Sequence, residues 1–108
     1  MLRFYTDELE LFIFDTDFGM GNCRITSKEN SHFALVISTQ ESHTPNDHPI
    51  FSINVNDIEI LYKYYRNKDI TSGGDLISKN GIFEYPAGRS ITLRDPAGNT
   101  FIIQQNFY

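Results

Sequence analysis

Cysteine and tryptophan are almost missing from this chain: Cys23 is the single cysteine in 108 residues, and tryptophan is absent. One cysteine excludes an internal disulfide, and a secreted domain of this size usually carries several. No apolar run approaches the roughly 20 residues that cross a bilayer. The polar start, residues 1–10, lacks the apolar segment of a secretory signal. We therefore expect a cytoplasmic protein with no membrane partner.

Basic residues are also scarce, since 9 Lys and Arg stand against 14 Asp and Glu, for a net charge of -5. A protein that binds nucleic acid needs a basic face for the phosphates. The densest basic cluster, around Lys63, Arg66 and Lys68, is more typical of a solvated helix face. Nucleic acid is therefore excluded as a partner. What the chain does have is core material: 40% of its residues are hydrophobic, with nine Phe and six Tyr, which suits one folded domain.

Hydrophobic periodicity predicts a mixture of strands and helices. Strands are expected over residues 9–14, 23–26, 32–38, 51–56, 76–78, 82–85, 90–94 and 100–104. The run from Leu9 to Phe14 is almost entirely apolar, so this strand is expected to be covered on both faces. A helix is expected near residues 2–9, and a second one follows Asp57, a good N-cap residue, as far as about Lys68.

Glycine and asparagine mark the turns. The stretch Phe18–Asn22 contains Gly19 and Gly21, which accept positive φ, and predicts a β-hairpin. Asn80-Gly81 predicts a second hairpin, between strands 76–78 and 82–85. In Asp95-Pro-Ala-Gly-Asn99, proline fixes φ and Gly98 supplies positive φ. Asp95 is expected to accept bonds from backbone amides two residues on, so this motif marks the fold rather than chemistry.

This last hairpin carries a resemblance. Gly88–Asn99, with the strand that follows, resembles the C-terminal signature of the vicinal-oxygen-chelate superfamily of glyoxalases, bleomycin-resistance proteins and extradiol dioxygenases. Phe51–Tyr65 resembles the strand and helix that open that family's second module, and Phe4–Leu9 resembles the helix of its first module. The resemblance implies an α+β fold of two βαβββ modules, which form a curved mixed sheet with helices on its convex face.

On this resemblance, residues 1–108 form a single glyoxalase/bleomycin-resistance-like domain. Module one covers residues 1–40, a linker covers 41–49, and module two covers 50–108. The chain begins inside what would be the first helix, so the family's first strand is missing. A partner subunit, a truncated gene start and a trimmed chain are the alternative explanations.

The resemblance also implies a metal site, built in such enzymes from His, Gln or Glu on the concave sheet. The matching positions here hold Ile50, Val36 and Ile102, and the remaining ligand is lost with the first strand. Aliphatic side chains cannot coordinate a divalent ion. We therefore expect no metal and no cofactor. A loop metal site from His43, Asp47 and His48 stays open as an alternative, although solvated loop residues are the favoured interpretation.

Alternation along three strands places small polar side chains on one sheet face. Either this is an ordinary solvated surface or it lines a ligand cleft, and the resemblance favours the cleft. The predicted ligand-binding residues are Ser52, Asn54, Thr92, Arg94, Ile102 and Gln104. No catalytic residue is expected, because Cys23 has no neighbouring base and is more typical of a small buried thiol.

We therefore hypothesise a metal-free small-molecule binding protein of the glyoxalase/bleomycin-resistance type, with antibiotic resistance as its biological class. It would sequester its ligand in a cleft at a homodimer interface, with or without exchange of a strand or module. One alternative is a metal-dependent lyase, isomerase, thiol transferase or dioxygenase of the same superfamily with non-standard ligands. Another is a non-catalytic interaction module that pairs through its open sheet edge.

Overall fold

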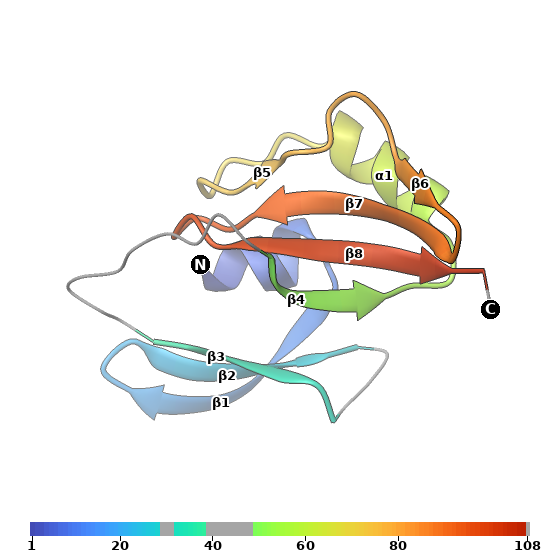
Figure 1. Cartoon of the computed structure of the whole chain (residues 1–108). Helices are drawn as coiled ribbons and strands as arrows, with labels where there is room; N and C mark the ends of the chain where they lie inside the picture. Colours follow the sequence, from blue (N-terminus) through green and yellow to red (C-terminus); the bar gives the residue numbers. More distant parts are fainter. Residues whose placement is uncertain (29–31, 39–48, 108) are drawn as a thin grey trace. The chain divides into compact units, whose positions relative to one another are not determined.

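The computed structural model describes residues 1–28, 32–38 and 49–107. It divides into two compact units, Met1–Thr44 and Pro45–Tyr108, each of which combines helix and antiparallel strands (Figure 1). The predicted α+β class is confirmed. Hydrogen bonds group the strands into two sheets, one in each unit, and only the sheet of the second unit is mixed. Most of the expected linker 41–49 lies outside the described residues.

The first unit consists of a short helix and a three-stranded antiparallel sheet of order β1-β2-β3. Its elements are helix η1 (Phe4–Glu8) and strands β1 (Phe12–Gly19), β2 (Asn22–Ser27) and β3 (Ala34–Ile37). No strand precedes η1 in the described residues at the start of the chain.

Helix η1 is wider than an α-helix. The N–H of Leu9 donates to the carbonyl of Phe4 at 2.9 Å, a bond that spans five residues and defines a π-helix. The predicted helix is thus confirmed, but with a different hydrogen-bond pattern. Its buried Tyr5 ring meets the Phe4 ring at 5.1 Å and the Phe12 ring at 5.6 Å, both edge to face, which joins η1 to the sheet.

The β1–β2 hairpin forms where the glycines predict it. Met20 and Gly21 separate the two strands and have φ values of 57° and 83°, the left-handed pair that matches strand twist. The expectation that β1 is covered on both faces is wrong, because Ile13 and Phe14 are 50% and 52% exposed. Helix η1 has only five residues, too few to cover more than the start of this edge strand.

The second unit is built around a five-stranded mixed sheet of order β4-β8-β7-β5, with β6 paired to β7. Strand β4 runs parallel to β8, and the other pairs are antiparallel. Its elements are β4 (Pro49–Asn54), α1 (Ile58–Asn67), β5 (Asp75–Leu76), β6 (Phe83–Tyr85), β7 (Gly88–Arg94) and β8 (Thr100–Asn106).

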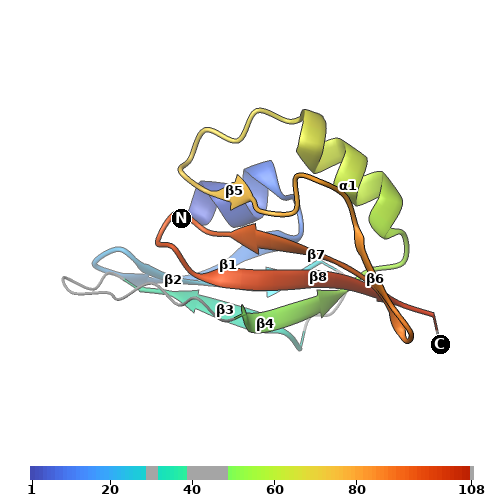
Figure 2. The ribbon, with the colours of Figure 1, turned by 45° about the horizontal axis from the view of Figure 1, so that its top comes forward.

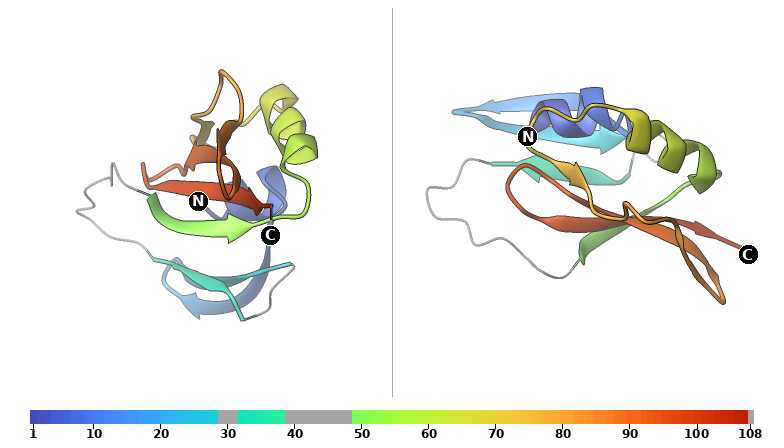
Figure 3. Two further views of the ribbon diagram at one scale, coloured as in Figure 1. Left: turned by 45° about the vertical axis from the view of Figure 1, so that its right-hand side comes forward. Right: turned by 90° about the horizontal axis from the view of Figure 1, so that it is seen from above.

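Helix α1 begins where the sequence predicts. The carboxylate of Asp57 accepts the N–H of Ile60 at 3.3 Å and caps the helix. The helix buries Ile58, Tyr62 and Tyr65, contacts β7 and β8, and stays on one side of this sheet in each view (Figures 2 and 3). The sheet side chains that alternate toward the core are fully buried: Ile91, Leu93, Phe101 and Ile103.

Two strand predictions for this unit need correction. Strand β4 includes Pro49 and Ile50, although the sequence favoured a start at Phe51, and its register against β8 shifts between Pro49 and Ser52. Proline is tolerated there because the strand lies at a sheet edge. The hairpin predicted at Asn80-Gly81 is wrong: β5 and β6 do not pair with each other, since each pairs with a different part of the seven-residue β7.

The Asp95–Asn99 turn joins β7 to β8 through a buried carboxylate. Asp95 is 3% exposed, and its Oδ1 accepts the N–H groups of Ala97 at 3.0 Å and Asn99 at 2.9 Å. Its Oδ2 accepts the side-chain amide of Asn99 at 3.2 Å. Gly98 has a φ of 90°, as the turn requires. The structural role predicted for Asp95 is confirmed.

We expect Asp95→Ala to lower the free energy of unfolding by about 1–3 kcal/mol, because it leaves buried amide donors without an acceptor. Asp95→Asn keeps one carbonyl oxygen and should lose less. Urea unfolding of both variants checks this order. Equal stability of Asp95→Ala and the parent chain would contradict it.

Gly88 is a second sensitive position, where β7 passes close to β8. A Cβ there would collide with the carbonyl oxygen of Gln105 and approach the Cα of Asn106 at 3.1 Å. We expect Gly88→Ala to lower the free energy of unfolding by about 1–3 kcal/mol, because the added methyl group overpacks the space between the two strands. The exposed neighbouring change Ala87→Ser serves as the control, and thermal unfolding of the two variants provides the measurement.

Candidate functional site

The strand pairing of the second unit brings all six predicted ligand-binding residues onto one face of the sheet. Strand β8 lies between β4 and β7, and residues directly opposite each other in neighbouring strands share a face. One row across the sheet is Asn54, Gln104 and Ser90, and the next is Ser52, Ile102 and Thr92. In the third row Thr100 lies opposite Arg94. We call these residues of β4, β8 and β7 the candidate face: Ser52, Asn54, Ser90, Thr92, Arg94, Thr100, Ile102 and Gln104.

Amide side chains form a connected group at one end of the candidate face. The Nε2 of Gln104 donates to the Oδ1 of Asn54 at 3.0 Å, and the Nδ2 of Asn106 donates to the same oxygen at 3.3 Å. Asn106 extends the alternation of β8 by one more step and was not singled out from the sequence. These amides are preorganised and present further donors and acceptors at the surface.

The middle and far end of the candidate face differ in character. Ile102 is half-buried between Ser52 and Thr92. Arg94 is exposed, and within the described residues its guanidinium makes no hydrogen bond or ion pair. Hydrogen-bonding groups at both ends of an aliphatic centre are the mixture that small-molecule sites use.

The opposite face of the same strands is engaged with helix α1. The Oε1 of Gln105 accepts the N–H of Ile58, the first residue of α1, at 3.0 Å. Arg89 pairs with Glu59 of the helix at 2.6 Å and lies near the Gln105 oxygen at 3.4 Å. The polar groups of Gln105 and Arg89 on this face therefore hold the helix in place.

The candidate face does not fit a divalent metal. None of its residues is a His, Cys, Asp or Glu, and no group of three or more such side chains that could hold an ion occurs in the described parts of the chain. Ile102 stands at its centre, Ile50 in β4 is 47% exposed, and Val36 in β3 is 64% exposed. The alternative ligands His43, Asp47 and His48 lie outside the described residues.

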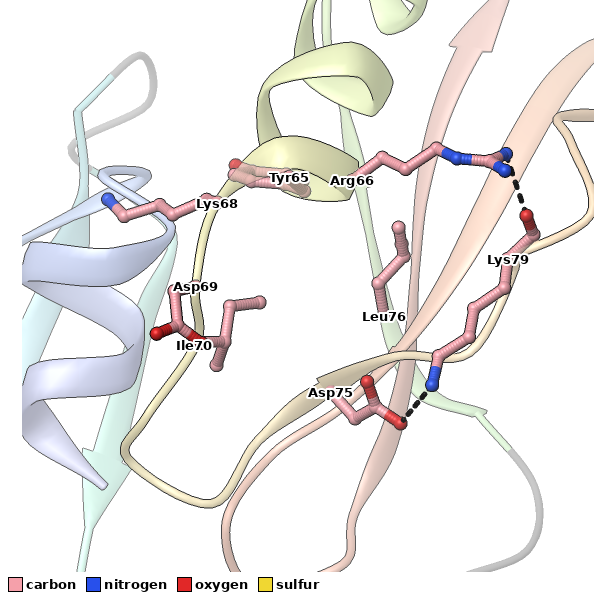
Figure 4. Close-up of a pocket in the computed structure, with 8 residues that line it drawn as sticks. All are labelled: Tyr65, Arg66, Lys68, Asp69, Ile70, Asp75, Leu76 and Lys79. Atoms are coloured by element: carbon pink, nitrogen blue, oxygen red, sulfur yellow. Dashed lines mark hydrogen bonds and ion pairs between the residues drawn. The ribbon is translucent and has the colours of Figure 1, made fainter.

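A separate hollow lies between the end of α1 and β5 and measures about 410 Å³. Tyr65 and Leu76 provide its buried walls, as Figure 4 shows. Its cations are already engaged: Arg66 donates to the carbonyl of Lys79 at 2.7 Å, and the Lys79 ammonium lies 3.5 Å from Asp75. The sequence did not point to this hollow, because its walls come from a helix end and an irregular loop.

Comparison with solved structures decides the fold. The chain is similar to a member of the glyoxalase/bleomycin resistance protein/dioxygenase superfamily from Sphaerobacter thermophilus DSM 20745, with a TM-score of 0.70 at 18% identity over 97% of this chain and 85% of the other. The chain has the vicinal-oxygen-chelate fold. No protein-family model and no curated protein matches the sequence.

Two other structures with this vicinal-oxygen-chelate fold are ligand-binding proteins. TnmS3, an antibiotic binding protein from Streptomyces sp. CB03234, has a TM-score of 0.71 at 18% identity, with 96% of this chain and 82% of TnmS3 covered. The bleomycin-binding protein of Streptomyces verticillus, solved with copper(II)-bleomycin, has a TM-score of 0.60 at 24% identity, with 97% and 82% covered. At these identities the likeness establishes the fold.

The helices that the structure describes include none long and apolar enough to span a membrane.

Cys23 is buried in β2, which agrees with its interpretation as a core thiol. Of the three clustered tyrosines in α1, Tyr62 and Tyr65 are buried and Tyr64 is 44% exposed, the distribution of a helix with one core face.

The neighbouring residues Gln104 and Gln105 provide a test of which face is structural. We expect Gln105→Ala to lower the unfolding free energy by about 1 kcal/mol, because the first turn of α1 loses a side-chain acceptor. Gln104→Ala removes a bond at an open surface and should change it by about 0.5 kcal/mol or less. Paired denaturant titrations measure both, and a larger loss for Gln104→Ala would show that the candidate face is packed.

Proposed function

We propose that this chain binds a small organic molecule on the candidate face, without a metal ion and without catalysing a reaction. The observation that carries the proposal is the composition of the face: hydroxyls, amides and one guanidinium surround Ile102, with no carboxylate, imidazole or thiol among them. Such a surface can orient a ligand by hydrogen bonds and apolar contact, but it offers no carboxylate, imidazole or thiolate to hold a metal ion and no general base.

The likeness to two ligand-binding proteins of this fold supports this proposal, because TnmS3 is an antibiotic binding protein and the protein of Streptomyces verticillus binds bleomycin. We accordingly propose Ser52, Asn54, Thr92, Arg94, Ile102 and Gln104 as the ligand contacts and an antibiotic-like compound as the ligand class. A homodimer in which the ligand lies near the subunit interface is part of the same proposal. So is a cytoplasmic location.

A titration followed by NMR tests the proposal. The isotope-labelled full chain is screened against ring-containing natural products, including bleomycin. We expect bound compounds to shift the side-chain amide signals of Asn54 and Gln104 together with the backbone signals of Thr92 and Arg94. Dialysis against a chelator should leave these shifts unchanged, because no metal takes part.

A pair of variants locates the effect. Ser52→Trp places a bulky ring beside Ile102 and should reduce affinity at least tenfold, whereas Lys63→Trp, at an exposed position of α1, should not. Shifts that gather instead around the hollow between α1 and β5 would overturn the proposed site. Stoichiometric divalent metal bound on the candidate face would favour the metal-dependent enzyme.

A further inference from the structure

Charge on the candidate face is concentrated in a single side chain. Arg94 is the one acidic or basic residue among the eight residues of this face, while the whole chain carries a net charge of -5. The sign of the face is therefore opposite to that of the protein. The net negative charge of the protein favours cationic ligands over anionic ones. A positive side chain on this face therefore points to a local preference that the net charge does not explain.

Nearby acids do not neutralise Arg94. Asp75 of the edge strand β5 lies opposite Arg94 in the strand register, but its carboxylate is directed to Lys79, 3.5 Å away (Figure 4). Arg89, by contrast, lies on the helix-covered face and is paired with Glu59 at 2.6 Å. Two arginines of one strand thus have different roles, and only Arg94 keeps its donor fork for an incoming group.

The layout of the candidate face sets the shape of the ligand. Ser90 lies opposite Gln104, a member of the amide group. Ser90 and Arg94 are four residues apart in β7, which places the two ends of the face roughly 13 Å apart. Ile102 and Thr92 lie between them. A ligand that uses the whole face has an apolar body of about this length, a hydrogen-bonding group at one end and a group that complements a guanidinium at the other.

From these contacts we infer that the ligand is an organic anion, whose carboxylate, sulfonate or phosphate ester pairs with Arg94 while its ring body covers Ile102. The inference rests on the proposed function and narrows the class of ligand. A guanidinium binds such groups through two parallel hydrogen bonds, which a neutral ligand of the same shape cannot reproduce.

Two fluorescent probes that differ in one group test the inference. Anilinonaphthalene sulfonate carries a sulfonate, and N-phenylnaphthylamine is its uncharged parent. We expect the full chain to bind the sulfonate at least tenfold more tightly than the parent. Arg94→Gln should remove that preference, Arg94→Lys should retain part of it, and Lys63→Gln, a loss of the same charge at an exposed position of α1, should leave it intact. Added salt should weaken the binding of the sulfonate probe and leave the binding of the uncharged probe unchanged.

Amide spectra recorded with each probe separate the possible failures. Both probes could shift the signals of Asn54 and Gln104 and yet bind with equal affinity, to the unsubstituted chain and to Arg94→Gln alike. In that case the anion inference is wrong and the binding face stands. If neither probe shifts these signals, the inference falls together with the proposed function. A sulfonate preference that survives in Arg94→Gln would place the anion contact elsewhere and also overturn the inference.

Discussion

The register of β7 against β8 depends on the buried carboxylate of Asp95. Its bonds to the amides of Ala97 and Asn99 fix the turn that joins the two strands. Because side chains alternate along a strand, a slip of one residue would move every side chain to the other face. The core and the candidate face are therefore two results of one constraint: when Ile91 and Phe101 face the helix, Thr92 and Ile102 must face away from it.

This division explains why equivalent side chains have different roles. On the face covered by α1, Gln105 and Arg89 are tied to the helix through Ile58 and Glu59. Their polar groups would be costly to bury without these partners. On the other face the exposed polar groups of Ser52, Asn54 and Arg94 incur no such cost, since water or a ligand can satisfy them. Ser90 and Thr100 on the same face are buried. The proposed site thus lies on the side of the sheet that does not carry the bonds to α1.

The sequence predicts well what is decided locally. The cap at Asp57, the left-handed turn after Gly19 and the Asp95 turn each depend on a few adjacent residues. Period two also groups the side chains of β4, β7 and β8 correctly by face. Long-range pairing is not encoded this way. Asn80-Gly81 has the chemistry of a hairpin, yet β7 competes for both flanking strands. The sequence likewise carries no signal that α1 bonds Arg89 and leaves Arg94 without a partner in the described residues, since that follows from which face the helix covers.

The parallel pairing of β4 with β8 has a consequence for how the second unit forms. These strands open and close the unit, and Asn54 and Gln104, which face each other across them, are separated by 50 positions in the chain. Loops of such length close slowly, because their entropy is lost before the contacts form. On the ribosome, β4 and α1 emerge well before their partner strand, and the apolar side of β4 stays uncovered until the last segment arrives. The sheet is therefore completed as a late, cooperative event, and the candidate face cannot form before β8 is present.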